Sequence, residues 1–387
     1  MNPIYLDYNA TTPIDPAVAE AMRPFLTGGL AGDFGNPSSS HLYGRRSHQA
    51  VDAARDQVAR ILNCAADEIV FTGSGSEADN LAIVGAAEAY RARGTHVITS
   101  VVEHPAVLNT CRYLERRGYQ VTYLPVDARG QVQVSQIERA IRPETILITI
   151  MHANNETGTL QPIREIAARA RPRGILVHSD AAQSVGKLPT RVDDLGVDLL
   201  TVVGHKLYAP KGIGALFIRN GVLLEPLIHG AGHENGRRAG TENVPYIVAV
   251  GKACEIALTG LLEEGARLRS QRDRLLQALF DRVPNLTQNG HARECLPNTL
   301  NLGFPDVDGE DLLAATPTVA ASTGSACHAG RTEPSEVLLA MGLSRERALG
   351  AVRLSIGRFT TDADVDQAAE DLATTWRSLT ATNKAQT

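Results

Sequence analysis

A lysine at the end of an apolar run is the first residue in this chain that could do covalent chemistry. The β-branched run 199–203 ends abruptly in Gly204-His205-Lys206. This pattern predicts a buried strand that delivers Lys206 to its carboxyl end. A lysine there is poorly solvated, so its pKa falls and its amine can attack a carbonyl cofactor. A lysine that leaves the sheet for solvent is the alternative, and the rest of the chain must decide between them.

Small residues after an earlier apolar run could bind an anion. The run 69–72 is followed by Gly73-Ser74-Gly75-Ser76 and a helical pattern. Backbone N–H groups at the start of that helix, with the Ser76 hydroxyl beside Gly75, would cradle a phosphate. A plain turn between a strand and a helix is the alternative. No Gly-Lys-Ser or Gly-Lys-Thr follows, so this is not a Walker motif.

Polar residues also follow other predicted strands, at what would be one edge of a parallel sheet. Asp180 and Gln183 follow one strand, His104 follows another, and Asn155 lies in an amide-rich loop after a third. A buried carboxylate needs a cationic partner such as a protonated pyridine nitrogen, unless Asp180 only caps a helix. His104 is either a stacking ring or a structural histidine. Combined with Lys206 and the anion cradle, these groups specify pyridoxal phosphate (PLP) as cofactor.

The elements that must position these residues alternate along the chain. Short apolar runs alternate with helical patterns, which is typical of a mainly parallel, seven-stranded type of sheet between helices. We therefore expect an α/β fold with a large PLP-binding domain over residues 15–258. Residues 1–14 and 259–387 would form a smaller α+β domain that carries Cys327. A long amphipathic helix is expected from about 245 to 281, broken near Gly260.

Composition excludes several classes of protein. The chain has 387 residues, 43% of them hydrophobic, and a net charge of −5 without any massed basic block, which argues against a nucleic-acid surface. Its five cysteines are scattered and lack CxxC spacing, which argues against disulfides and zinc and for a reducing compartment. No signal peptide and no apolar run of membrane-spanning length is evident, so we expect a soluble, cytoplasmic protein.

Several motifs resemble those of the cysteine desulfurases, from about residue 4 to 375. This family consists of class V aminotransferase-like enzymes with the type I PLP fold, which are homodimers with the active site near the interface. The motifs are 5–12 (YLDYNATT), Glu103-His104, 152–158 (HANNETG), 180–187 (DAAQSVGK), 204–206 (GHK), 238–241 (RAGT), 322–327 (STGSAC) and 352–355 (VRLS).

The resemblance implies a PLP site. The residues it assigns to the cofactor are Lys206, Gly75, Ser76, His104, Asn155, Asp180, Gln183, His205 and, from the other subunit, Thr241. Lys206 would hold PLP covalently and act as the base at the substrate Cα. Asp180 would pair with the pyridinium nitrogen and Gln183 with the ring hydroxyl. His104 would stack on the ring and assist proton transfer.

The resemblance also implies the reaction, which is removal of sulfur from L-cysteine. Arg353 would grip the substrate carboxylate as a fork, beside Asn155. Cys327, as a thiolate, would attack the substrate sulfur and leave L-alanine and a persulfide for an acceptor protein. The small residues around Cys327 suit the group with a long, mobile cysteine loop, whereas an inert buried cysteine is the alternative.

Departures from the family pattern leave the precise activity open. Val203 stands where many relatives carry a serine that contacts the phosphate, and Thr201 lies on the same face by strand alternation. The sequences of residues 203–206 (VGHK) and 326–328 (ACH) also resemble those of selenocysteine lyases. The C-terminal extension with which housekeeping members of the family hold the iron–sulfur scaffold does not follow Leu379, which weakens the case for a general iron–sulfur role and leaves a specialised sulfur donor open. The sequence does not name the acceptor, which could be an iron–sulfur scaffold, a tRNA-thiolation enzyme or a DNA phosphorothioation system. A PLP-dependent aminotransferase is a further hypothesis. A non-catalytic sulfur relay is another, but the joint presence of Lys206, Asp180, Gln183 and Arg353 argues against it.

Overall fold

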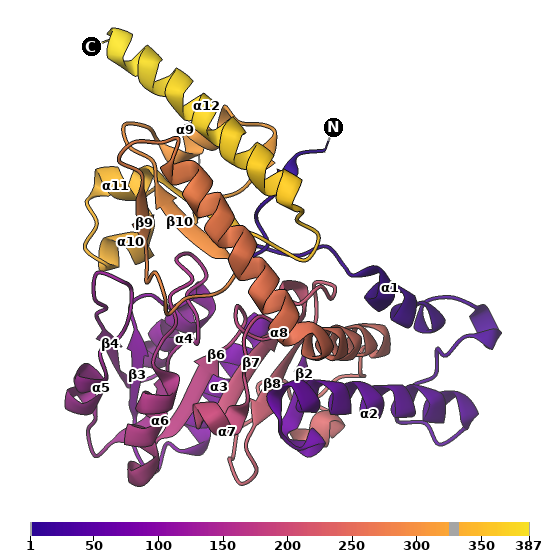
Figure 1. Cartoon of the computed structure of the whole chain (residues 1–387). Helices are drawn as coiled ribbons and strands as arrows, with labels where there is room; N and C mark the ends of the chain where they lie inside the picture. The colour runs from indigo at the N-terminus through magenta and orange to yellow at the C-terminus, as the bar shows by residue number, and fades with distance from the viewer. Residues whose placement is uncertain (1, 325–332, 387) are drawn as a thin grey trace.

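A sheet of seven strands forms the centre of the molecule. The computed structural model describes residues 2–324 and 333–386 (Figure 1). In spatial order the strands are β2 (Ile69–Thr72), β8 (Gly214–Ile218), β7 (Leu199–Val203), β6 (Leu176–Asp180), β5 (Thr145–Thr149), β3 (His96–Ser100) and β4 (Gln120–Leu124). Neighbouring strands are parallel except at β8, which is antiparallel to β2 and β7. The predicted α/β fold with a mainly parallel sheet is confirmed.

The central strands form from short runs that can be buried on both faces. Every residue of β5, β6, β7 and β8 is buried. Burial on both faces is the pattern of a parallel sheet that helices cover on each side. These helices are α2 (Leu42–Leu62), α3 (Gly75–Ala89), α4 (Pro105–Arg116), α5 (Val134–Ala140), α6 (Ile163–Ala170), α7 (Val192–Leu195) and the first part of α8 (Val244–Phe280). Helix α1 (Pro16–Met22) packs against α8, to the side of the sheet in Figure 1.

A smaller part, drawn in orange to yellow, lies above the large sheet in Figure 1. Its antiparallel sheet has the order β12 (Ala351–Ser355), β10 (Thr299–Gly303) and β9 (Thr287–Asn289). Near it, β1 (Ile4–Tyr5) pairs with β11 (Val319–Ala320), so the N-terminal residues lie with the C-terminal part. Its helices are α9 (Gly309–Ala314), α10 (Glu336–Ala340), α11 (Arg345–Leu349) and α12 (Asp362–Gln386). The exact division into two domains stays a prediction.

Helix α8 joins the two parts. It is one continuous helix of 37 residues, so the predicted break near Gly260 is wrong, although its two halves run in different directions in Figure 1. By length and composition alone α8 could cross a membrane. Its apolar side chains are shared between two cores, however, with Cys254 in the core of the large sheet and Leu268 and Leu275 in that of the smaller part. This is the pattern of a core helix.

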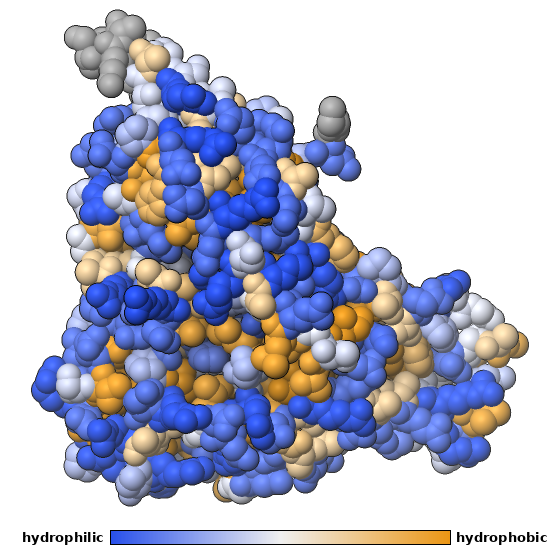
Figure 2. All heavy atoms as spheres, in the orientation of Figure 1, coloured by the Kyte–Doolittle hydropathy of each residue, from blue (hydrophilic) through white to orange (hydrophobic). Residues whose placement is uncertain are grey.

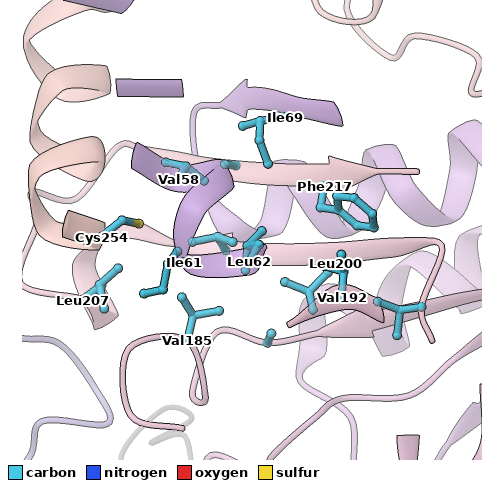
Figure 3. Packing of buried hydrophobic residues seen from close by; sticks show 14 of the residues in the cluster. Val58, Ile61, Leu62, Ile69, Val185, Val192, Leu200, Leu207, Phe217 and Cys254 are labelled. Carbon is cyan, nitrogen blue, oxygen red and sulfur yellow. The ribbon is translucent and has the colours of Figure 1, made fainter. Parts of the chain in front are cut away.

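The core beside β7 holds the strand that leads to Lys206, and Figure 3 shows Leu200 packed near Phe217 and Val192. Leu200 is fully buried, so Leu200→Ala is expected to lower the free energy of unfolding by about 2–5 kcal/mol. Leu262 on α8 is 79% exposed, and Leu262→Ala is the matched control, with an expected change within about 0.5 kcal/mol. Urea denaturation measures both. Equal losses in the two variants would contradict this assignment of the core.

Candidate functional site

The ends of the central strands open into one cavity of about 330 Å³. Nine of the residues predicted for the site line it: Gly75, Ser76, His104, Asn155, Asp180, Gln183, His205, Lys206 and Arg353. Thr241 is exposed and does not line the cavity of its own chain. Cys327 lies outside the described residues. The residues at the strand ends of the large sheet meet at one edge because parallel strands bring their carboxyl ends together, and Arg353 joins them from the smaller sheet.

Lys206 lies in the single 3₁₀ turn (Gly204–Lys206) that follows β7. Its Nζ donates hydrogen bonds to the backbone oxygens of Asn9, at 2.6 Å, and Ala10, at 2.5 Å. Burial, and next the charge of Arg353, lower the pKa of Lys206 to about 8. A lowered pKa leaves more of the amine unprotonated at neutral pH, which is the state that attacks an aldehyde.

Two buried carboxylates lie deeper in the cavity. Asp180 ends β6, is 7% exposed, and accepts a hydrogen bond at 2.8 Å from the Ala182 N–H. Burial raises the pKa of the Asp180 carboxyl. A cation bound beside this carboxylate would lower the pKa again. Asp79, on α3, has no counterpart among the residues predicted from sequence. Its Oδ1 is buried without a hydrogen-bond partner among the described residues, and burial followed by the charge of Asp180 raises its pKa.

The start of α3 forms the predicted anion cradle. The Ser74 side chain caps the helix by accepting the Glu77 N–H at 3.1 Å, and Gly75 and Ser76 are the first helical residues. First-turn N–H groups have no partner within their helix, so they can bind an anion. A Cβ on Gly75 would lie 2.3 Å from Cγ2 of Val203, so only glycine fits against this wall.

Val203 fills the place of the missing serine with an apolar side chain, and it lines the cavity. Thr201 does not replace that hydroxyl: its Oγ1 lies 3.1 Å from Nε2 of the buried His178, and it does not line the cavity. His205 faces the same region, with its Nδ1 3.2 Å from Oγ1 of Thr11. Burial, and next the charge of Lys206, lower the pKa of His205 to about 4, so it is neutral near pH 7.

His104 lies at the mouth of the cavity, where it caps α4. Its Nδ1 accepts the Ala106 N–H at 3.1 Å, so a neutral ring carries its proton on Nε2. Although part of the ring is exposed, the surrounding wall desolvates it and lowers the pKa of His104, while the charge of Asp180 acts in the opposite direction. The ring is therefore a neutral N–H donor near pH 7.

Arg353, on β12, brings the smaller part of the chain to the cavity. Its NH2 donates to Oδ1 of Asp7 at 2.7 Å and its NH1 to the Asn155 backbone oxygen at 3.1 Å. Its Nε is buried without a partner among the described residues, which suits an incoming carboxylate. Asn9, from the same N-terminal segment as Asp7, also contacts the loop of Asn155: its Nδ2 donates to the Asn155 backbone oxygen at 3.2 Å. Asp7 and Asn9 belong to the motif at residues 5–12, yet nothing in their local pattern indicated these contacts.

Arg353→Ala is expected to raise the KM for L-cysteine by about 10–100-fold, because it removes charge-assisted hydrogen bonds to the substrate carboxylate. Arg353→Lys is expected to recover only part of this loss, since a point charge cannot replace the fork. Steady-state kinetics, with the visible absorption of bound PLP as a control for cofactor content, measure the effect. A KM that stays at the wild-type value in both variants would remove Arg353 from substrate binding.

The cavity fits PLP by its own chemistry. It offers a lysine of lowered pKa for an aldehyde, a helix start for a phosphate and a buried carboxylate that needs a cation. Asp79 adds a further buried oxygen that has no hydrogen-bond partner among the described residues, although Nε2 of His178 lies 3.7 Å from it. An aldehyde, a phosphate and a basic pyridine nitrogen are the three groups that this set would complement.

Comparison with known proteins identifies the family. The model of the class-V aminotransferase family matches residues 4–368, and the chain belongs to this family. A cysteine desulfurase IscS from Pectobacterium carotovorum is 49% identical over 371 residues, which cover 95% of this chain and 91% of that protein. Within the family, the chain groups with the cysteine desulfurases, which are PLP-dependent enzymes.

Solved structures agree with this assignment. A NifS-like protein is 36% identical, has a TM-score of 0.90, and the match covers 97% of this chain and 100% of that one. A structure described as SspA in complex with cysteine is 39% identical, has a TM-score of 0.81, and the match covers 92% of this chain and 99% of that one. The predicted family and cofactor are therefore confirmed.

Proposed function

We propose that this cavity removes the sulfur of L-cysteine, yielding L-alanine and a persulfide on Cys327 that is passed to an acceptor protein. The observation that carries the proposal is the meeting of Lys206, Asp180 and Arg353 in one cavity. Together they provide an aldehyde-binding amine, an acid for a pyridine nitrogen and a fork for a carboxylate. Relatives named cysteine desulfurase, and a neighbour solved with cysteine, support the substrate.

Each group of residues has a separate task in this proposal. The residues that would hold PLP are Lys206, Asp180, Gln183, His104, Gly75, Ser76, Asn155 and His205, with Thr241 from a second subunit. Bound PLP supplies an electron sink that makes the substrate Cα–H acidic. Arg353 and Asn155 orient the amino acid, and the free Nζ of Lys206 accepts the proton from Cα. His104, with its proton on Nε2, assists proton transfer.

The sulfur step belongs to Cys327, whose role rests on the family motif. Its thiolate attacks the substrate Sγ, so that an S–S bond forms while the bond between Cβ and sulfur breaks. The electron pair of the broken bond stays with carbon, which takes up a proton to give the alanine methyl group. The persulfide then passes to an iron–sulfur scaffold, a tRNA-thiolation enzyme or a DNA phosphorothioation system. A reducing cytoplasm suits such thiol chemistry.

A homodimer would complete the site. The segment between α1 and α2 projects from the body in Figure 1, and Figure 2 shows apolar spheres on this arm. Leu30, Phe34 and Leu42 there are 79%, 55% and 52% exposed, which suits burial against a second subunit. Thr241, exposed and away from its own cavity, would reach the partner's phosphate site. Light scattering on the PLP-loaded protein tests this, and a monomeric mass at micromolar concentration would contradict it.

Two other enzyme activities are separable by substrate. A selenocysteine lyase is the main alternative, and the ratio of kcat/KM for L-cysteine and L-selenocysteine in parallel assays decides between them. The proposal requires turnover of L-cysteine to alanine and sulfide in the presence of a thiol reductant. Turnover restricted to L-selenocysteine would establish the lyase instead. An aminotransferase would need a 2-oxo acid and would survive Cys327→Ala.

A further inference from the structure

Lys187 is a buried cation that the proposed mechanism does not use. It lies between β6 and α7, is 8% exposed, and forms no ion pair within the described residues. Lysines are rarely buried without a partner, because removing the charge from water is costly. Burial, and next the charges of Lys206 and Arg353, lower the pKa of Lys187 to about 7. A group kept at this cost beside the cofactor cavity needs a reason.

The hydrogen bonds of Lys187 lead directly into the cavity. Its Nζ donates to Oε1 of Gln183 at 3.1 Å. At the other end of the Gln183 amide, Nε2 donates to the Asn9 backbone oxygen at 3.0 Å. The same oxygen also accepts a hydrogen bond from Nζ of Lys206. Since Lys187 donates and the Asn9 oxygen can only accept, both ends of the Gln183 amide are specified. The amide nitrogen, with two hydrogens, therefore faces the cavity side.

We propose that Lys187 is a positioning residue that fixes the orientation of the Gln183 amide, so that its second N–H points at the ring oxygen of bound PLP. The inference rests on the proposed role of Gln183. Without Lys187 only the hydrogen bond to the Asn9 backbone oxygen would oppose a half-turn of the Gln183 amide. A turned amide would present its oxygen, which would repel the ring oxygen instead of stabilising it. Lys187 would thus act through Gln183 and never touch the cofactor.

The competing explanation is that the charge of Lys187 acts directly on the chromophore, without Gln183. A double-mutant cycle separates this direct effect from an effect that passes through Gln183. An N–H donated to the ring oxygen stabilises its negative charge and so lowers the pKa of the visible chromophore of bound PLP. Loss of a nearby cation would also raise that pKa, but independently of Gln183. Independent effects add, whereas effects that pass through one hydrogen bond do not.

The experiment is a pH titration of the visible absorption of PLP-loaded wild type, Lys187→Met, Gln183→Leu and the double variant. Each single variant is expected to raise the chromophore pKa by about one unit, and the double variant is expected to rise no further. Lys187→Arg, which keeps a donor, should retain the wild-type value. Lys187→Leu serves as a second apolar replacement if methionine packs poorly, and thermal unfolding checks that each variant is folded.

Three results would overturn the inference, and they have different consequences for Gln183. A shift in Gln183→Leu without one in Lys187→Met, or shifts that add in the double variant, would remove the positioning role of Lys187 and leave that of Gln183 intact. An unchanged chromophore pKa in Gln183→Leu would show that Gln183 does not contact the ring oxygen. In that case the proposed role of Gln183 and the inference both fail.

Discussion

Lys206→Ala is expected to abolish the visible absorption of covalently bound PLP and to lower the turnover of L-cysteine by about 10³-fold or more. The physical reason is that Lys206 is the cavity amine of lowered pKa and supplies both the covalent bond to the aldehyde and the base at Cα. Absorption spectra of the purified variant, and alanine formation from L-cysteine, measure the two effects.

Lys252→Ala is the matched control, because the side chain of Lys252 is 35% exposed on α8 and pairs only with Glu255 among the described residues. We expect it to keep the wild-type spectrum and turnover. If Lys206→Ala retained the visible band after dialysis, another lysine would hold the cofactor, and the assignment of Lys206 would be wrong. Lys187, whose pKa is also lowered by burial, would be the next lysine to test.

Cys327→Ser is expected to lower sulfide formation from L-cysteine by about 10³-fold while leaving the PLP spectrum unchanged. A serine hydroxyl cannot replace a thiolate as acceptor of sulfur. The other cysteines are poor substitutes: burial raises the pKa of Cys64, Cys111 and Cys254 to about 12, and also raises that of Cys295.

Cys64→Ser is the control for this experiment, since Cys64 is the most exposed of the cysteines that the structure describes. We expect its turnover to stay within about twofold of wild type, because Cys64 does not line the cavity and serine is similar in size. Sulfide release in Cys327→Ser at the wild-type rate would show that the persulfide does not form on Cys327. An accompanying requirement for a 2-oxo acid would instead indicate an aminotransferase.

The sheet and the residues at its strand ends could be predicted because their signals are local. An apolar run followed by Gly-His-Lys, or by small residues before a helix, carries its own evidence for a strand end. Parallel topology then brings Lys206, Asp180, His104 and Gly75 together without further information. Their chemical roles stay predictions until the variants are measured.

Other features depend on contacts that no local pattern encodes. Asp7 and Asn9 come from the N-terminal segment, and its pairing with β11 and with Ser355 of β12 brings them to Arg353 and Lys206. Asp79 occupies an ordinary helical position one turn into α3, so its sequence context gives no signal of a buried carboxylate.

Helix α8 shows the opposite case, in which a local sequence signal predicts a break that the structure does not have. A glycine costs only about 1 kcal/mol in a helix interior, so Gly260 need not end a helix that packs along much of its length. The apolar content of α8 likewise reflects burial in two cores and not contact with lipid. In both cases tertiary packing outweighs the local preference of the chain.

The central claim is tested most directly by mass spectrometry of the PLP-loaded protein after one turnover of L-cysteine without reductant. We expect one L-alanine for each active site, and a peptide containing Cys327 that is heavier by one sulfur atom and returns to its original mass after reduction. The same peptide from Lys206→Ala should stay unmodified. Formation of alanine without added sulfur on Cys327, or sulfur on another cysteine, would contradict the account.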